Sequence, residues 1–175
     1  EIAPIVEPEA KRTGVQFIVA CDGAPDVNGD VAMLRQAFLN LALNACQAMP
    51  NGGTLRIQAE AVRGRRVLVT VADTGIGIKP EDLGRIFDLY FTTRERGSGI
   101  GLSMVYRTVQ LHDGEIEVQS TPGKGTTFTI VLPPSAVAPT PVPEHEPGMV
   151  GEYRRSAIAA MNRGTTTIAS SSTTS

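Results

Sequence analysis

Five short apolar segments along the chain predict β-strands. They are rich in β-branched and aromatic residues, and in the last two the apolar side chains alternate with polar ones. The segments are residues 15–20, 54–62, 66–72, 115–120 and 126–132. Short turns, one around Gly64 and one over residues 121–125, predict that the second and third strands form a hairpin, as do the fourth and fifth.

Between these strands the apolar residues recur with the spacing typical of helices. A long helix is predicted after Asp30, which suits an N-cap, and before the Pro-Asn-Gly-Gly run that follows Met49. Its apolar residues recur at steps of three and four and form one stripe: Val31, Leu34, Phe38, Leu41, Ala45 and Ala48. Shorter helices are expected before Gly14, near residues 80–87 and over residues 99–112.

These elements predict an α+β fold in two layers. About three helices would cover one face of a mixed, mostly antiparallel sheet of about five strands. The sheet and its helices would use residues 1–133, in which residues 1–14 are a connecting segment and first helix. Residues 134–175 are rich in Pro and end in a Ser/Thr tract, so a linker and a disordered tail are expected there.

Composition and charge exclude several functional classes. No apolar run approaches the ~18 residues that span a bilayer, so no membrane contact is expected from this chain. The chain starts at Glu1, so we expect either a fragment of a longer protein or a processed end. The net charge of −2 gives no general reason to bind nucleic acid. Cys21 and Cys46 lack metal-ligand spacing and predict neither zinc site nor disulfide framework, which favours a cytoplasmic location.

A row of carboxamides marks the face of the long helix opposite the apolar stripe: Gln36, Asn40, Asn44 and Gln47. Asn is a poor mid-helix residue because its side chain competes for backbone hydrogen bonds. The row is either a solvated polar face or a surface that faces a ligand. In the second case an amide oxygen of Asn40 or Asn44 can coordinate Mg²⁺, and its NH₂ group can reach a phosphate.

A second group of candidate residues follows the third predicted strand. Asp73 ends that strand and opens a turn that contains Gly75, Gly77 and Ile78. A carboxylate held there is a fixed acceptor that suits an exocyclic amine such as that of adenine, and glycines let the backbone approach a flat ring. An ordinary strand-to-loop turn explains the same residues.

A third group precedes the helix predicted over residues 99–112. Gly97, Gly99 and Gly101 expose backbone N–H groups at a helix N-terminus, where anions bind. Thr92, Thr93 and Arg94 add hydroxyls and a guanidinium fork that suits phosphate. A flexible loop with a helix cap is the alternative. The glycine spacing fits neither a dinucleotide-binding fingerprint nor a P-loop.

In this order the three groups resemble the ATPase (Bergerat) fold shared by histidine kinases, gyrase-type topoisomerases, the heat-shock chaperone and mismatch-repair ATPases. Five segments carry the resemblance, which covers residues 15–132. They match the asparagine box, first glycine box, phenylalanine box, second glycine box and final hairpin of that superfamily: residues 40–48, 73–78, 86–93, 97–102 and 123–128. The phenylalanine box is similar to that of kinases specifically, and the nitrogen-regulation type of sensor kinase resembles the chain most.

The resemblance implies a site for ATP and Mg²⁺. Asn44, together with Asn40, would bind the metal and the phosphates. Asp73 would accept a hydrogen bond from the adenine amino group, and Thr126 would support it through a water molecule. The wall around the adenine would come from Gly75, Gly77 and Ile78.

The same resemblance implies a lid over the triphosphate, with Arg94 as a phosphate partner. Phe87 and Phe91 would anchor this lid against the core, although aromatic residues are equally at home in a core. The lid residues are Thr92, Thr93, Arg94, Gly97, Gly99, Gly101 and Leu102.

The residue at position 40 and the histidines bear on the reaction. Members of the superfamily that hydrolyse ATP have a Glu where Asn40 stands, and a carboxamide cannot take a proton from water. Phosphoryl transfer is therefore expected. His112 ends a predicted helix and reads as structural, and His145 lies in the Pro-rich segment, so no catalytic residue is assigned and the phospho-accepting histidine is expected on another domain.

The leading hypothesis is the catalytic domain of a two-component sensor histidine kinase. Its implied partners are ATP, an upstream dimerisation domain that carries the acceptor histidine, and the receiver domain of a response regulator. Two alternatives share the fold: a serine kinase of the anti-sigma type, and a nucleotide-binding module without transfer activity.

Overall fold

The computed structural model describes residues 2–21, 26–62, 66–94 and 97–134. The chain divides into two compact units, Glu1–Val142 and Pro143–Ser175, and every described residue belongs to the first. The predicted linker and tail lie outside the described residues except for Pro134, which forms an antiparallel bridge with Val27. The turn around Gly64 and most of the loop after Cys21 are outside them too.

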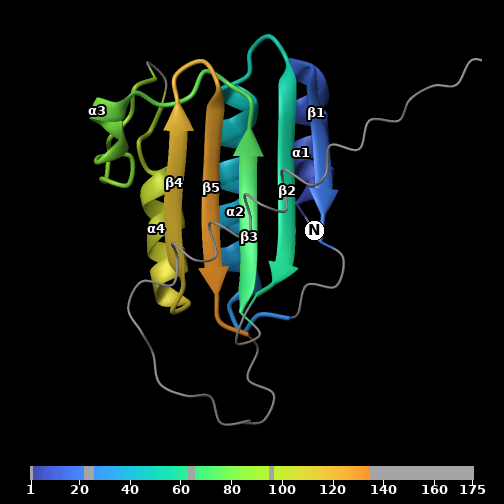
Figure 1. Ribbon diagram of the computed structural model, residues 1–175, viewed down its shortest axis with the longest axis vertical. Coiled ribbons are helices and arrows are strands. Elements are labelled where there is room, and N and C mark those ends of the chain that lie inside the picture. The colour runs from blue at the N-terminus through green and yellow to red at the C-terminus, as the bar shows by residue number, and fades with distance from the viewer. Residues whose placement is uncertain (1, 22–25, 63–65, 95–96, 135–175) are drawn as a thin grey trace, which may run out of the picture. The chain divides into compact units, whose positions relative to one another are not determined.

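A five-stranded sheet forms the centre of the described unit (Figure 1). Its strands are β1 (Val15–Ala20), β2 (Gly53–Ala61), β3 (Val67–Asp73), β4 (Glu115–Thr121) and β5 (Gly125–Leu132), in the order β1-β2-β3-β5-β4. β1 pairs with β2 in parallel, and all other neighbours are antiparallel. The prediction of a mixed, mostly antiparallel sheet with two hairpins is confirmed.

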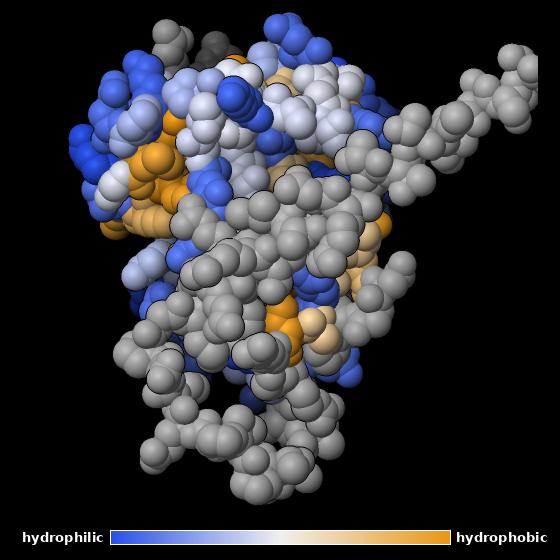
Figure 2. All heavy atoms as spheres, in the orientation of Figure 1, coloured by the Kyte–Doolittle hydropathy of each residue, from blue (hydrophilic) through white to orange (hydrophobic). Residues whose placement is uncertain are grey.

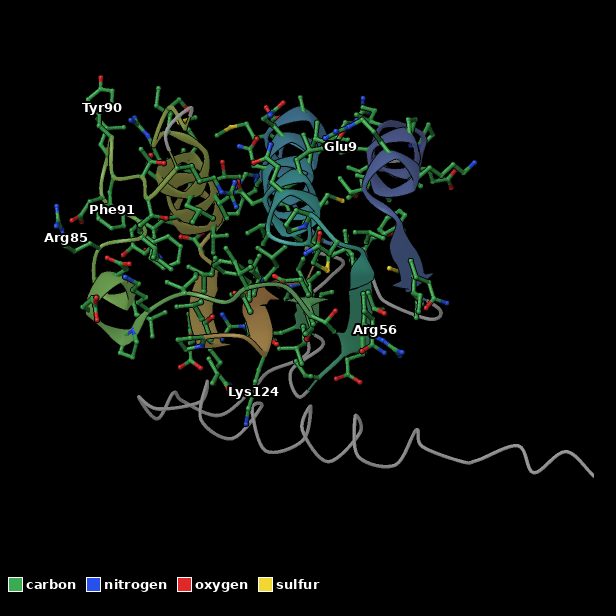
Figure 3. The ribbon with its side chains drawn as sticks, turned by 90° about the horizontal axis from the view of Figure 1, so that it is seen from above. Glu9, Arg56, Arg85, Tyr90, Phe91 and Lys124 are labelled. Carbon is green, nitrogen blue, oxygen red and sulfur yellow. The ribbon has the colours of Figure 1, made fainter. Side chains whose placement is uncertain are left out.

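The helices of the described residues are α1 (Ala3–Thr13), α2 (Val31–Gln47), α3 (Pro80–Leu83) and α4 (Gly101–Leu111). Seen from above, α1, α2 and α4 lie side by side on one face of the sheet (Figure 3). α3 stands beside the sheet near β4 (Figure 1), where polar side chains dominate the visible surface (Figure 2). No helix among the described residues is long and apolar enough to cross a membrane.

The core lies between the helices and the sheet. Among the helices, α2 contributes the most buried residues to this core: Leu34, Ala37, Leu41, Ala42, Ala45 and Cys46. The predicted stripe is wrong at its first position, because Val31 is 67% exposed. Val31 is the first residue of α2, and the buried face begins one turn later, at Leu34.

The N-terminus of α2 is fixed by a cap and by a histidine from α4. The Asp30 side chain accepts hydrogen bonds from the N–H groups of Ala32 and Met33. His112 caps the C-terminus of α4, as predicted, and its Nε2 accepts from the Asp30 N–H at 2.9 Å. Its Nδ1 lies 2.7 Å from the Thr108 carbonyl, so Nδ1 carries the proton. The imidazole therefore joins the two helices.

His112→Ala is expected to lower the free energy of unfolding by about 1–3 kcal/mol, because it leaves the Asp30 N–H and the Thr108 carbonyl without their partner. Urea denaturation of the chain measures this. Gln110→Ala is the matched control on the same helix, since Gln110 is exposed and its side chain makes one long, part-buried hydrogen bond, 3.4 Å to the Gly114 carbonyl. Equal losses in the two variants would contradict the bridging role.

Candidate functional site

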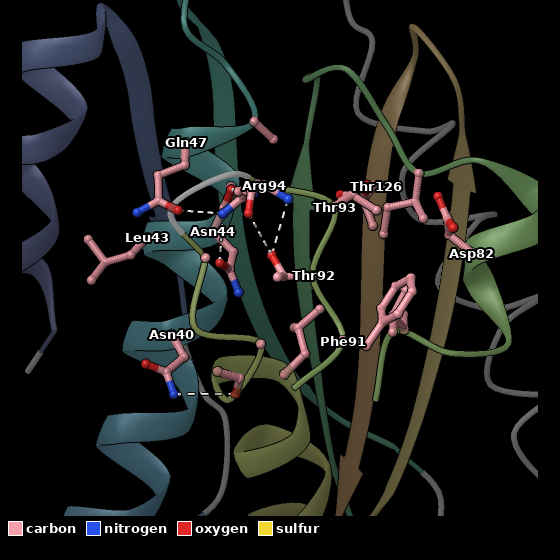
Figure 4. Close-up of a pocket in the computed structure, with 18 of the residues that line it drawn as sticks. Asn40, Leu43, Asn44, Gln47, Asp82, Phe91, Thr92, Thr93, Arg94 and Thr126 are labelled. Carbon is pink, nitrogen blue, oxygen red and sulfur yellow. Dashed lines mark hydrogen bonds between the residues drawn. The ribbon is translucent and has the colours of Figure 1, made fainter. Parts of the chain in front are cut away.

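A cavity of about 450 Å³ opens beside the C-terminal half of α2. Its walls come from α2, the loop after β3, residues 91–94 and 97–99, the start of α4 and β5. Every predicted site residue except Gly75 lines it: Asn40, Asn44, Asp73, Gly77, Ile78, Thr92, Thr93, Arg94, Gly97, Gly99, Gly101, Leu102 and Thr126. The fold thus gathers three segments that are far apart in the sequence around one space (Figure 4).

The carboxamide row of α2 forms one wall of this cavity. Asn40 donates to the Gly101 carbonyl at 3.4 Å and accepts from the Gln36 amide at 3.0 Å. Asn44 and Gln47 lie further along the same wall (Figure 4). The row is not simply a solvated face, because Asn40 also connects α2 to the first residue of α4.

Arg94 crosses the cavity to reach the α2 wall. Its Nη1 donates to the Asn44 Oδ1 at 3.0 Å and also to the Gln47 side-chain oxygen. Its Nη2 donates to the Asn44 backbone carbonyl at 3.1 Å. The guanidinium therefore donates to the same side-chain oxygen of Asn44 that was predicted to bind a metal. Gln47, which the sequence placed only in the polar row, takes part in this contact.

Asp73 lies where β3 ends, and the backbone holds one of its two carboxylate oxygens. Oδ1 accepts from the Gly75 N–H at 2.8 Å and from the Thr126 N–H at 3.3 Å. Within the described chain no donor contacts Oδ2. Burial raises the pKa of Asp73 above its ordinary value, and the two backbone hydrogen bonds and the charge of Arg94 oppose this rise. The result is a fixed acceptor with one free oxygen.

Ser120 is a residue of the site that the sequence analysis missed. Its hydroxyl oxygen lies 2.7 Å from the Ile78 nitrogen, 3.0 Å from the Gly125 carbonyl and 2.9 Å from the Thr126 hydroxyl. Ser120 and Thr126 are paired in the β4–β5 register. The predicted hairpin already placed two hydroxyl residues across from each other, which was the available signal.

The glycines of the first glycine turn lie close to the protein's own backbone. A Cβ on Gly75 would lie 2.5 Å from the Ala48 carbonyl oxygen, and a Cβ on Gly77, whose φ is +70°, would lie 2.2 Å from the Thr121 carbonyl oxygen. Each missing side chain thus makes room for the protein's own backbone. They let the turn pack between α2 and the β4–β5 hairpin, which sets the position of Asp73.

Residues 91–94 and 97–99 line the cavity on the N-terminal side of α4. Gly97 approaches the Thr92 side chain so closely that a Cβ would lie 2.1 Å from its hydroxyl oxygen, and the Gly99 carbonyl accepts from the Tyr90 N–H at 3.0 Å. α4 then begins at Gly101 with no side-chain cap on its N-terminus. Its first N–H groups are therefore available for an anion at the edge of the cavity.

Apolar side chains line the end of the cavity away from Asn40. They include Ile76, Ile86 and Phe128, which the sequence analysis did not assign to the site, and Phe91, which it expected to anchor the lid. Phe87 packs against Tyr106 of α4, with ring centroids 5.3 Å apart, and against Phe128 at 6.5 Å. The predicted anchoring by Phe87 thus joins the loop to α4 and β5. Leu43, Asp82 and Ser98 are further lining residues.

The chain matches the family described as "Histidine kinase-, DNA gyrase B-, and HSP90-like ATPase" over residues 29–136. The chain is 36% identical to sporulation kinase E of Bacillus subtilis over 130 residues, or 74% of this chain and 18% of that protein. It is 40% identical to the sensor histidine kinase ZraS of Escherichia coli K12 over 130 residues, or 74% of this chain and 28% of the relative. The chain therefore spans less than a third of these curated relatives.

Solved structures show the same architecture. Full-length ShkA in complex with AMPPNP superposes with a TM-score of 0.70 at 33% identity, covering 79% of this chain and 30% of ShkA. The nucleotide-free catalytic domain of histidine kinase ThkA gives 0.66 at 27% identity, covering 75% of this chain and 87% of that domain. The second comparison covers nearly a whole isolated domain, so the described unit has the extent of one such domain.

Proposed function

The chain belongs to the family of histidine kinase-, DNA gyrase B- and HSP90-like ATPases, and on this premise we propose that it is the ATP-binding catalytic domain of a two-component sensor histidine kinase. It would bind ATP with Mg²⁺ and transfer the γ-phosphoryl group to a histidine on a dimerisation domain. Residues 1–133 would form this domain. The observation that carries the proposal is the single cavity that brings Asp73 together with Asn44 and Arg94.

The cavity has the two chemically different ends that ATP requires. At one end the free Oδ2 of Asp73 would accept a hydrogen bond from the adenine amino group, while Ile78, Phe91 and Phe128 exclude water around the ring. At the other end Asn44, Arg94 and the uncapped N-terminus of α4 would receive the triphosphate. AMPPNP bound to the relative ShkA is an ATP analogue, which supports this reading.

Magnesium would use amide oxygens and phosphate in this arrangement. The described residues contain no cluster of three or more His, Cys, Asp or Glu side chains that could hold a metal without a nucleotide. The Asn44 Oδ1 is a hard ligand of the type Mg²⁺ accepts, and Mg²⁺ usually combines one or two such ligands with phosphate oxygens and water. Arg94 would have to leave Asn44 when the metal arrives, and it could then pair with the phosphates.

Transfer to a protein acceptor fits the site better than hydrolysis. Both polar groups of the Asn40 amide are hydrogen-bonded, to Gln36 and to the Gly101 carbonyl, and an amide is no base for water. Asp82, a carboxylate that also lines the cavity, lies at the opposite end from Asn40 (Figure 4). In the transfer, the bond between the γ-phosphorus and the bridging oxygen of ATP breaks. A bond from phosphorus to an imidazole nitrogen forms, and ADP leaves.

The partners follow from this role. The acceptor histidine would be supplied by a separate dimerisation domain, and the phosphohistidine would pass its phosphoryl group to the receiver domain of a response regulator. A cytoplasmic location suits a site that needs ATP and a chain whose cysteines are free. The relative ZraS is named a sensor histidine kinase, which favours histidine over the serine of an anti-sigma kinase as the acceptor.

The proposal is tested by binding first and by transfer second. Calorimetry of the chain with ATP is expected to show saturable binding that weakens strongly when Mg²⁺ is chelated. With radiolabelled ATP and a histidine-bearing dimerisation domain, the transferred label is expected to be lost in acid and retained in base. Label that survives acid would assign the chain to the serine kinases instead. Absence of ATP binding with and without Mg²⁺ would refute the proposal.

A further inference from the structure

Ser120 lies behind the wall of the cavity and contacts three polar groups at once. They are the Ile78 N–H, the Gly125 carbonyl and the Thr126 hydroxyl. Thr126 lines the cavity and is only 5% exposed, whereas Ser120 is not among the lining residues. Ser120 therefore acts on the cavity only through its neighbours.

The hydrogen atoms of these two hydroxyls can be placed by counting. The Ser120 oxygen accepts from the Ile78 N–H, and Ser120 has one hydrogen to donate. The Gly125 carbonyl can only accept, so that hydrogen points to Gly125. The 2.9 Å contact with Thr126 is then a hydrogen bond only if Thr126 is the donor. One arrangement satisfies all three contacts, and it commits the Thr126 hydrogen to Ser120.

This arrangement fixes the polarity of the cavity wall. With its hydrogen committed, Thr126 presents only lone pairs to the cavity, as does the free Oδ2 of Asp73. A water molecule between the two would give both hydrogens to them and would itself offer a lone pair to a ligand. Either way, the side chains of Asp73 and Thr126 accept hydrogen bonds from a ligand and have none to donate.

We propose that Ser120 is a specificity-determining positioning residue, which holds the Thr126 hydroxyl as an acceptor so that the site selects a 6-amino over a 6-oxo purine nucleotide. This inference rests on the proposed ATP-binding function. The exocyclic amine of adenine donates two hydrogens and matches the wall. The 6-oxo group of inosine triphosphate would bring lone pairs against lone pairs, and that mismatch leaves buried acceptors unpaired.

The test compares the affinities of the whole chain for Mg²⁺–ATP and Mg²⁺–ITP by calorimetry. Ser120→Ala frees the Thr126 hydroxyl to rotate and donate to the 6-oxo group. The preference for ATP over ITP is expected to narrow by about 3- to 10-fold, the range of one hydrogen bond. Ser120→Cys should narrow it less, because a thiol makes weaker hydrogen bonds in the same space. It also serves as the second variant if Ser120→Ala does not fold.

Two further variants separate the effect of the Thr126 hydroxyl's orientation from a general structural effect of the Ser120 substitution. Thr126→Val removes the hydroxyl, so adding Ser120→Ala to it should leave the ATP-to-ITP ratio unchanged, whereas independent effects would multiply. Thr13→Ala, which removes a hydroxyl bonded only to carbonyls of its own helix, should not change the ratio.

Equal weakening of both nucleotides in Ser120→Ala and Ser120→Cys, with the ratio intact, would reduce Ser120 to a structural residue and overturn the inference. The proposed function would survive that result, since it depends on the parent chain binding Mg²⁺–ATP. A parent chain that binds neither nucleotide would instead overturn the proposed function.

Discussion

Replacing Asp73 with Asn is expected to weaken ATP binding by about 100-fold or more and to leave the domain at least as stable as the parent. In the variant the amide oxygen must keep the two backbone hydrogen bonds that Oδ1 accepts, from Gly75 and Thr126. The amide NH₂ group then points into the cavity. A charge-assisted hydrogen bond, worth about 1.5–3 kcal/mol, is replaced by two opposed donors, and each 1.4 kcal/mol is about a factor of ten in affinity.

The stability of this variant follows from the direction of the pKa shift. Burial raises the pKa of Asp73 in the folded domain above its unfolded value, so folding disfavours the charged carboxylate. This penalty is absent below the unfolded pKa, grows as the pH rises, and is complete above the folded pKa. Above the folded pKa the parent carries the whole penalty, and the neutral Asn carries none at any pH. The advantage of Asp73→Asn should therefore grow with pH across that window.

Calorimetry at neutral pH measures the affinity, and urea denaturation at acidic and neutral pH measures the stability. Asp82→Asn is the matched control, since Asp82 also lines the cavity but neither Gly75 nor Thr126 holds its side chain. It should change ATP affinity far less. A folded Asp73→Asn variant that binds ATP as tightly as the parent would show that the carboxylate takes no part in ATP binding. If the free energy of unfolding of Asp73→Asn falls relative to that of the parent as the pH rises, the assigned cost of burying the charge is contradicted.

Local patterns were enough to predict most elements of this fold. Hairpins form between neighbouring segments, so the β2–β3 and β4–β5 pairs followed from turn residues and alternation. The position of β5 between β3 and β4, and the parallel pairing of β1 with β2, join segments that are distant in the sequence. No local signal encodes such pairings, because they depend on how the helices cover the sheet.

The candidate site shows the same division between local and non-local information. Asn44, Asp73 and Gly101 lie in recognisable motifs, and each is held in place by its own element. The contact of Arg94 with Asn44 spans fifty positions and depends on where the loop crosses the cavity. The role of Ser120 required the hydrogen-bond partners of a hydroxyl, which a sequence does not contain. Residue types were therefore predictable, but their partners were not.

The second large effect is expected from Asn44→Asp, which should weaken Mg²⁺–ATP binding by about 100-fold although it adds a stronger metal ligand. Arg94 already donates to the Asn44 side chain and to its backbone carbonyl. A carboxylate at this position would replace the neutral amide acceptor with a charged one, so that the Arg94 guanidinium forms an ion pair and is held more strongly. The nucleotide would have to break that pair, and the added negative charge would face the triphosphate.

The opposing contributions can be separated with a second substitution. Arg94→Ala removes a phosphate partner, so on its own it should weaken binding modestly. In combination with Asn44→Asp, Arg94→Ala also removes the guanidinium that pairs with the new carboxylate. Mg²⁺ can then bind to this carboxylate and to the phosphates at the same time. The double variant should therefore bind Mg²⁺–ATP more tightly than Asn44→Asp alone, which is a coupling opposite in sign to two independent losses.

Calorimetry on the four chains of this cycle, with Mg²⁺ and with chelator, measures the coupling. Asn44→Ala provides the control, because it removes the metal ligand without creating a carboxylate for Arg94. Adding Arg94→Ala to it should give no rescue. If the losses of Asn44→Asp and Arg94→Ala simply add, the contact between these two residues has no bearing on nucleotide entry. A rescue confined to the carboxylate variant, and present only with Mg²⁺, would place the guanidinium and the metal in competition for one side-chain position.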